Sequence, residues 1–127
     1  MNNQNNNQQM EFQFKKENPI LSKRKEESNH ILNKFPDKVP VICEKDPKSK
    51  INSILKTRYL IPKYYTVSQF NYLINKKIEL KNEESFYLLA NGINIISGKD
   101  TMYEIYNKYK DEDGFLYITY TSELIWG

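Results

Sequence analysis

Cysteine and histidine, the residues most often used in nucleophilic catalysis and zinc binding, are scarce in this 127-residue chain. Cys43 is the one cysteine and His30 the one histidine, so an intrachain disulfide and a zinc site built from several such residues are excluded. Cys43 lies in an apolar stretch, which favours a buried structural thiol over a nucleophile, and a single cysteine fits a reducing compartment such as the cytoplasm. The sequence shows no paired acid and base and no phosphate-binding loop. We therefore expect no enzymatic activity, no metal and no cofactor.

The C-terminal stretch TYTSELIWG offers a different kind of chemistry. It places the apolar residues Leu124, Ile125 and Trp126 directly before Gly127, the last residue given. Glycine has no side chain, so the carbonyl of its carboxyl group is open to attack without steric hindrance. Taken alone, however, a terminal glycine is more readily explained by chance or by truncation of the sequence.

The charge of the chain is unevenly distributed, although its net value is only +3. Residues 1–63 contain 13 Lys and Arg against 7 Asp and Glu, whereas residues 64–127 contain 6 against 9. This asymmetry suits a protein that docks onto partners or anionic surfaces, but it is too weak to indicate nucleic-acid binding. Lys23, Arg24 and Lys25 form a basic patch, explained equally well by contact with anionic lipid or a partner and by a solvated helix face.

The N-terminal segment is predicted to hold a tail and two helices. Residues 1–10 are almost entirely Asn and Gln, which have nothing to bury and indicate a disordered tail. The charged residues 11–35 predict one short and one longer surface helix, with Ile31, Leu32 and Phe35 on one face of the longer one. No apolar run approaches the roughly 20 residues of a membrane-spanning helix, so contact with a membrane would require attachment.

The remaining segments predict a sheet with two more helices. Capping boxes at Thr66 and Thr101 mark the starts of the two helices. Pro40 indicates that one backbone edge near the start of the first strand is unpaired, and residues 93–100 suit either a short strand or an extended loop. Runs of apolar, β-branched and aromatic residues predict strands at Val39–Lys45, Arg58–Ile61, 85–90 and 115–121.

The order of these elements favours one arrangement among the α+β folds. The first and last strands are the most apolar, so we expect them at the centre of the sheet, and the acidic run Asp111–Asp113 is most simply a solvated turn before the last strand. A hairpin, a crossing helix and a return to a buried central strand make the β-grasp arrangement of ubiquitin, here with two additional N-terminal helices.

Four separate stretches carry a resemblance that is more specific than this order. They resemble, in order and with compatible spacing, the autophagy ubiquitin-like modifier family, which includes microtubule-associated protein light chain 3 and the GABA-receptor-associated protein. The resemblance runs from about Pro19 to Gly127 and implies a ubiquitin-like domain at 11–121 followed by a flexible conjugation tail at 122–127. The stretches are FPDKVPVICEK (35–45), RYLIP (58–62), TVSQF (66–70) and DEDGFLYITY (111–120).

The resemblance also implies a role for Gly127. In this family an ATP-dependent E1-like enzyme activates the C-terminal glycine, an E2-like enzyme carries it as a thioester, and the glycine ends as an amide on phosphatidylethanolamine. A cysteine protease removes the modifier again, and family members commonly carry further residues after the glycine. The resemblance therefore implies a cytoplasmic protein that resides on autophagosomal membranes when lipidated; an unconjugated, soluble ubiquitin-like adaptor is the alternative.

A peptide-docking groove is the second implication. The second predicted strand should expose an edge, where an extended peptide can pair and place alternate side chains in pockets. Family members bind receptors with aromatic-x-x-aliphatic motifs in this way. By position, the aromatic pocket would be lined by Glu27, Ile31, Pro40, Ile42, Arg58, Leu60 and Phe115. The aliphatic pocket would be lined by Tyr59, Ile61, Pro62, Tyr65, Phe70 and Leu73. Lys56, Arg58 and Lys77 would form a basic rim that attracts acidic flanking residues, whereas the alternative assigns Ile42, Leu60 and Phe70 to an ordinary core.

Overall fold

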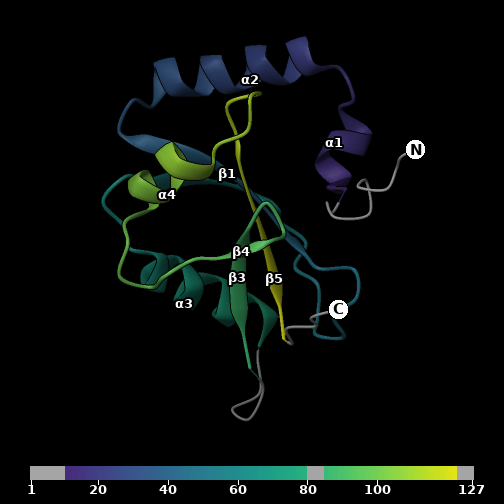
Figure 1. The fold of residues 1–127 in the computed structure, drawn as a ribbon. Helices are drawn as coiled ribbons and strands as arrows, with labels where there is room; N and C mark the ends of the chain where they lie inside the picture. Colours follow the sequence, from purple (N-terminus) through teal and green to yellow (C-terminus); the bar gives the residue numbers. More distant parts are fainter. Residues whose placement is uncertain (1–10, 80–84, 123–127) are drawn as a thin grey trace, which may run out of the picture.

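The computed structural model describes residues 11–79 and 85–122 (Figure 1). The predicted N-terminal tail and Gly127, with the residues just before it, lie outside the described residues. Within the described part, no helix is long and apolar enough to cross a membrane. The elements are α1 Gln13–Glu17, α2 Leu21–Lys34, β1 Lys38–Lys45, β2 Arg58–Pro62, α3 Val67–Ile78, β3 Tyr87–Ala90, β4 Asn94–Ile95, α4 Met102–Tyr109 and β5 Leu116–Thr121.

The five strands form one mixed sheet in the order β2-β1-β5-β3-β4. The first and last strands, β1 and β5, pair in parallel near its centre, and β1 and β2 form the antiparallel hairpin, so both expectations are confirmed. Pairing with β5 begins at Val41, which leaves Pro40 without a partner on that side, as its missing N–H requires. The α+β, ubiquitin-like β-grasp with two additional N-terminal helices is therefore the fold of this chain.

Both predicted capping boxes are present. Thr66 accepts a hydrogen bond from the N–H of Gln69 at the start of α3, and Thr101 accepts one from Glu104 at the start of α4. These helices bury their apolar stripes against one face of the sheet. The fully buried members of this main core include Val39, Val41, Cys43, Phe70, Ile74, Ala90, Met102, Leu116, Ile118 and Tyr120.

The opposite face of β1 and β5 carries a second, aromatic cluster. Because successive strand residues point to opposite faces, Ile42 and Tyr117 leave the main core and join it. The segment before β5 adds Phe115, and the N-terminal segment adds Phe12 and Phe14, which are both buried. The N-terminal segment is thus bound to the sheet and is not a free surface helix.

Helix α2 presents a polar face to the sheet, which differs from the prediction. Its buried residues are Arg24 and Ser28, whereas Ile31 and Leu32 and the residue after the helix, Phe35, are only half-buried. Arg24 Nε lies 2.8 Å from Asp113 Oδ2, and Ser28 Oγ donates to the Asp113 carbonyl oxygen. The prediction that Lys23, Arg24 and Lys25 form an exposed basic patch is therefore wrong for Arg24. Its guanidinium is buried because the buried carboxylate of Asp113 requires a charged partner.

The acidic run is likewise not a solvated turn throughout. Asp113 is fully buried and accepts hydrogen bonds from the Tyr117 hydroxyl and the Phe115 N–H, in addition to Arg24. Asp111 binds Lys15 of α1 at 2.9 Å. Of the three, Glu112 alone is exposed. The run therefore anchors both N-terminal helices, because its carboxylates face the two cations that those helices bring to the sheet.

Candidate peptide-docking edge

Strand β2 lies at the edge of the sheet. Its inner side pairs with β1, and no described strand pairs with its outer side. The side chains alternate as predicted: Tyr59 and Ile61 are buried, while Arg58 and Leu60 are exposed. An unpaired edge with alternating exposure is the geometry that accepts an added strand.

The residues predicted for the aromatic pocket come together beside this edge. Ile42 and Phe115 belong to the aromatic cluster, and Ile31 of α2 packs against it. Ile42 has no exposed surface and Phe115 only 2%, so they form a floor that solvent does not reach, whereas Leu60 is 37% exposed. Pro40 pairs with Leu60 across the hairpin.

An ion pair closes this part of the edge. Arg58 Nη1 lies 2.5 Å from Glu27 Oε2, so β2 and α2 are joined above the floor. The Arg58 guanidinium also lies 4.7 Å from the ring centroid of Phe14, which in turn meets Phe115 edge-on at 5.1 Å. The sequence reasoning missed Phe14, although the alternation of Phe12 and Phe14 in EFQF could have indicated one buried side of an extended segment.

The residues predicted for the aliphatic pocket come from β2, from helix α3 and from the segment between them, on the face of the sheet that carries the main core. Tyr59, Ile61 and Phe70 belong to the main core, and Tyr65 and Leu73 pack against it. Phe70 is fully buried, as the alternative of an ordinary core requires. Pro62, at the end of β2, is half-buried.

An open hollow of about 610 Å³ continues this region along the outer surface of α3. Tyr65, Leu73 and Lys77 are the predicted residues that line it. The hollow therefore offers accessible apolar surface next to the buried part of the aliphatic set.

Two lysines of the predicted basic rim frame Tyr59. The ammonium groups of Lys56 and Lys77 lie 5.0 Å and 6.0 Å from the centroid of its ring. Burial, followed by the charges of Cys43 and Tyr120, raises the pKa of the Tyr59 phenol, so it stays neutral and its hydroxyl donates to the Lys56 carbonyl oxygen. The rim cations are thus fixed near the edge, with Arg58 already paired.

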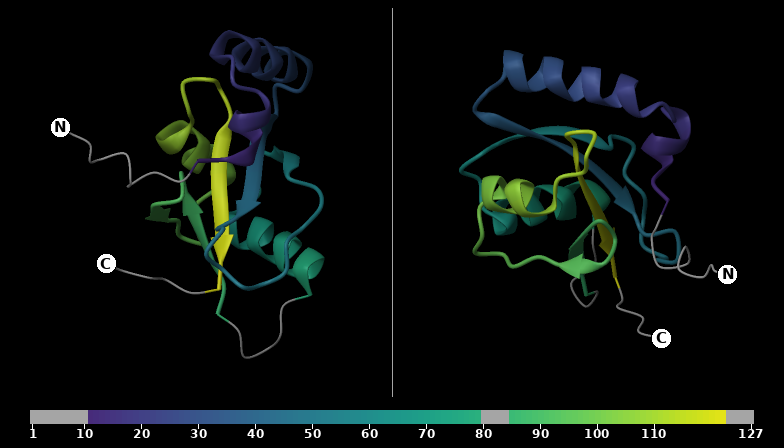
Figure 2. Two further views of the ribbon diagram at one scale, coloured as in Figure 1. Left: turned by 90° about the vertical axis from the view of Figure 1, so that its right-hand side faces the viewer. Right: turned by 45° about the horizontal axis from the view of Figure 1, so that its top comes forward.

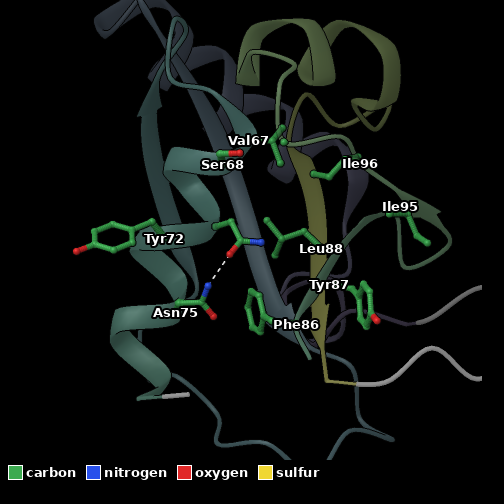
Figure 3. Close-up of a pocket in the computed structure, with 11 residues that line it drawn as sticks. Val67, Ser68, Tyr72, Asn75, Phe86, Tyr87, Leu88, Ile95 and Ile96 are labelled. Atoms are coloured by element: carbon green, nitrogen blue, oxygen red, sulfur yellow. Dashed lines mark hydrogen bonds between the residues drawn. The ribbon is translucent and has the colours of Figure 1, made fainter. Parts of the chain in front are cut away.

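A second cavity, of about 290 Å³, lies between α3 and strand β3 with the β4 segment (Figure 3). In Figure 3 Phe86 faces Asn75 across the cavity, while Tyr72 points away from it. Asn75 donates to Asn71 at 2.5 Å, and its own side-chain oxygen is buried without a hydrogen-bond partner. None of the predicted site residues lines this cavity.

Metal-binding side chains are not clustered in the part of the chain that the structure describes. Among residues 11–79 and 85–122 no group of three or more His, Cys, Asp or Glu side chains could hold a metal ion. Cys43 is fully buried, and burial followed by the charge of Glu44 raises the pKa of its thiol, so the reactive thiolate is suppressed.

Comparisons with known proteins agree with this geometry. The family model described as "Autophagy protein Atg8 ubiquitin like" matches residues 23–127. The chain is 46% identical over 118 residues to Autophagy-related protein 8 of Pichia angusta, covering 93% of each chain. It is 44% identical to the protein of the same name from Aspergillus niger, covering 93% of this chain and 98% of the relative. The crystal structure of Trypanosoma brucei ATG8 superposes with a TM-score of 0.82 at 31% identity, covering 93% of this chain and all of that one.

Proposed function

The chain belongs to the Atg8 family of autophagy ubiquitin-like proteins, and from this premise we propose that it is a modifier attached to membranes through Gly127. In this proposal it binds receptors with aromatic-x-x-aliphatic motifs at the β2 edge and is itself a substrate of enzymes, not an enzyme. The observation that carries the receptor part is the unpaired edge of β2, with the predicted aromatic set on one face and the aliphatic set on the other. The part of the proposal that concerns membrane attachment through Gly127 rests on membership of the Atg8 family.

Receptor binding follows from strand addition. The peptide backbone hydrogen-bonds to the outer side of β2, and side chains three positions apart then fall on opposite faces of the sheet. The aromatic residue reaches the face of Leu60, and the aliphatic residue reaches the face of Tyr65 and Leu73. Because Ile42 and Phe115 are buried at rest, the aromatic ring enters only when the Arg58–Glu27 pair swings aside.

Membrane attachment proceeds at the carboxyl group of Gly127. An E1-like enzyme uses ATP to convert the carboxylate to an activated acyl group, which an E2-like enzyme carries as a thioester. The amine of phosphatidylethanolamine attacks this thioester, the thiol leaves, and an amide forms. A cysteine protease reverses the attachment. The protein is then cytoplasmic when free and bound to autophagosomal membranes when lipidated.

Replacement of the acceptor tests the attachment. In cells of the source organism, Gly127→Ala should abolish the membrane-bound form, because the methyl group hinders passage through the enzymes' channels. Intact mass of detergent-extracted protein detects the added phospholipid. Glu123→Ala, in the same tail, should keep it. A lipid adduct that persists on Gly127→Ala would reject Gly127 as the acceptor, whereas absence of any adduct from the unaltered protein would favour the soluble adaptor.

Truncation of an exposed edge residue tests the docking. Leu60→Ala should weaken an aromatic-x-x-aliphatic peptide about tenfold in isothermal titration, as expected for an apolar contact at the centre of an interface. The side chain is partly exposed, so the fold should tolerate the change, which circular dichroism can verify. Ile93→Ala removes a more exposed side chain between β3 and β4, at the opposite edge of the sheet, and should leave affinity unchanged. Equal affinities for both variants would remove the pocket assignment.

A further inference from the structure

The loop after β1 carries lysines beside the point where the chain leaves the sheet. Residues 45–50 contain three lysines and one acidic residue, Asp46. Lys48 and Lys50 are exposed, and neither takes part in an ion pair among the described residues. Lys45 instead donates to the carbonyl oxygens of Asp46 and Ser49, which holds the base of the loop in place. Two cations therefore face solvent from an ordered turn.

This loop is tied to the end of β5. Ser49 Oγ lies 3.1 Å from Ser122 Oγ and accepts a hydrogen bond from the Ser122 N–H at 3.2 Å. The Asp46 N–H donates to the Tyr120 carbonyl oxygen at 2.9 Å. Eight residues after Asp46, the Ile54 N–H donates to the Tyr120 hydroxyl at the same distance. The loop that carries the lysines is therefore held beside the end of β5.

Chain length limits the distance between this loop and Gly127. Gly127 follows Ser122 by five residues, and an extended chain spans at most about 3.5 Å per residue, so the two lie within about 18 Å of each other. Helix α2 contacts Asp113, in the turn before β5, whereas Ser122 follows the last residue of that strand. At about 3.3 Å per residue, the six residues of β5 alone separate the two by about 20 Å. Both views of Figure 2 show α2 and the end of β5 at opposite ends of the molecule.

We infer that Lys48 and Lys50 meet the anionic headgroups of the bilayer once Gly127 is attached to lipid, an inference that rests on the attachment proposed above. A headgroup potential decays over a Debye length of about 8 Å at physiological ionic strength, so it acts on charges held beside the anchor. The lysines of α2 carry the same charge at the far end and lie outside its range. The attached protein thus prefers membranes rich in anionic lipid.

An enzyme-free anchor tests this contact on the full chain. Six histidines added after Gly127 bind phosphatidylcholine vesicles that contain a nickel-chelating lipid, with or without phosphatidylserine. Phosphatidylserine should tighten binding by about thirtyfold for two lysines near the surface. The gain should disappear with Lys48→Glu combined with Lys50→Glu, and at high salt. Binding is measured by vesicle co-sedimentation.

The exposed lysines of α2 provide the matched control. Lys23→Glu with Lys25→Glu makes the same change of charge at the opposite end and should keep the phosphatidylserine effect. The inference is overturned if phosphatidylserine has no effect on the unaltered chain, or if both pairs of variants lose it equally. Because no conjugation occurs in this assay, its outcome is independent of the Gly127→Ala test.

Discussion

The two faces of the sheet hold their helices by different forces. On one face, α3 and α4 bury apolar side chains such as Phe70, Ile74 and Met102 against the strands. On the other face, α2 is joined to the sheet by the buried pair of Arg24 and Asp113, beside a small aromatic cluster. The first face is therefore held mainly by non-directional burial, and the second depends on specific partners.

The contrast extends to α1. Glu44, in β1, accepts hydrogen bonds from the first backbone N–H groups of α1, those of Gln13 and Phe14, at 2.8 and 2.9 Å. A carboxylate at this position satisfies donors that have no partner within the helix and matches the positive end of its dipole. The N-terminal helices are thus attached through charges, and small chemical changes there should cost more than small changes in the apolar core.

The largest expected effect is the loss of the Asp113 carboxylate. Asp113→Ala should lower the free energy of unfolding by about 4 kcal/mol, because Arg24 stays buried without its partner and the Tyr117 hydroxyl loses its acceptor. Urea titration measures this change. Glu112→Ala, at the exposed neighbour, should stay within about 0.5 kcal/mol. A loss below about 1 kcal/mol for Asp113→Ala would mean that charge does not hold this face.

A smaller loss is expected at Gly114, in the same turn. Its φ of +92° is unfavourable for a residue with a side chain, and an added Cβ would collide with the Ser28 side chain. Gly114→Ala should therefore cost about 2 kcal/mol. Thermal unfolding of this variant with and without Ser28→Gly separates the two causes, since only the collision is relieved by the second change. Full recovery in the double variant would show that the backbone conformation costs nothing.

The apolar face should respond less to a small change. Ile74→Val removes one methylene from a fully buried side chain of α3 and should cost about 1 kcal/mol. Urea unfolding of this variant beside Asp113→Ala compares the two faces directly. The comparison breaks down if Ile74→Val proves the more destabilising of the two.

The smallest effect is the pH dependence contributed by Asp111. Burial acts to raise the pKa of its carboxyl group, but the hydrogen bonds from Lys15 and the Asp113 N–H, together with the charges of Lys15 and Arg24, lower this pKa from its usual value. A lowered folded-state pKa gives stability that is present above the unfolded pKa and is lost as pH falls through the folded one. Because the Lys15 pair is partly exposed, this contribution is less than about 1 kcal/mol. Asp111→Asn should flatten the stability curve below about pH 4, and an unchanged acid limb would contradict the assignment.

Sequence patterns predicted the apolar face well. Capping boxes at Thr66 and Thr101 and stripes at helical spacing placed α3 and α4, and the continuous apolar run predicted a β5 buried along its whole length. These signals are local, since a cap or a stripe depends on residues a few positions apart. The alternating exposure of β2 was predicted from the same kind of local pattern, whereas its place at the edge was predicted because no further strand was available to cover it.

Patterns failed where polar residues find distant partners. Arg24 and Asp113 are 89 positions apart, and each taken alone resembles an ordinary surface charge. The same holds for Arg58 and Glu27, which the resemblance placed near one another without predicting their ion pair. No property of either sequence neighbourhood distinguishes a paired buried charge from a solvated one.

The sequence by itself determined the fold class, the central position of the first and last strands and the start of α3 and α4, because these depend on local periodicity and caps. The family followed from motifs in a fixed order. Tertiary structure alone decided that Asp113 lies inside the molecule, that Phe14 lies beneath Arg58, and that the lysine loop is tied to Ser122. The physical reason is that a charged side chain is buried only where it contacts a partner of opposite charge. Partners distant in the sequence come into contact only once the sheet has formed.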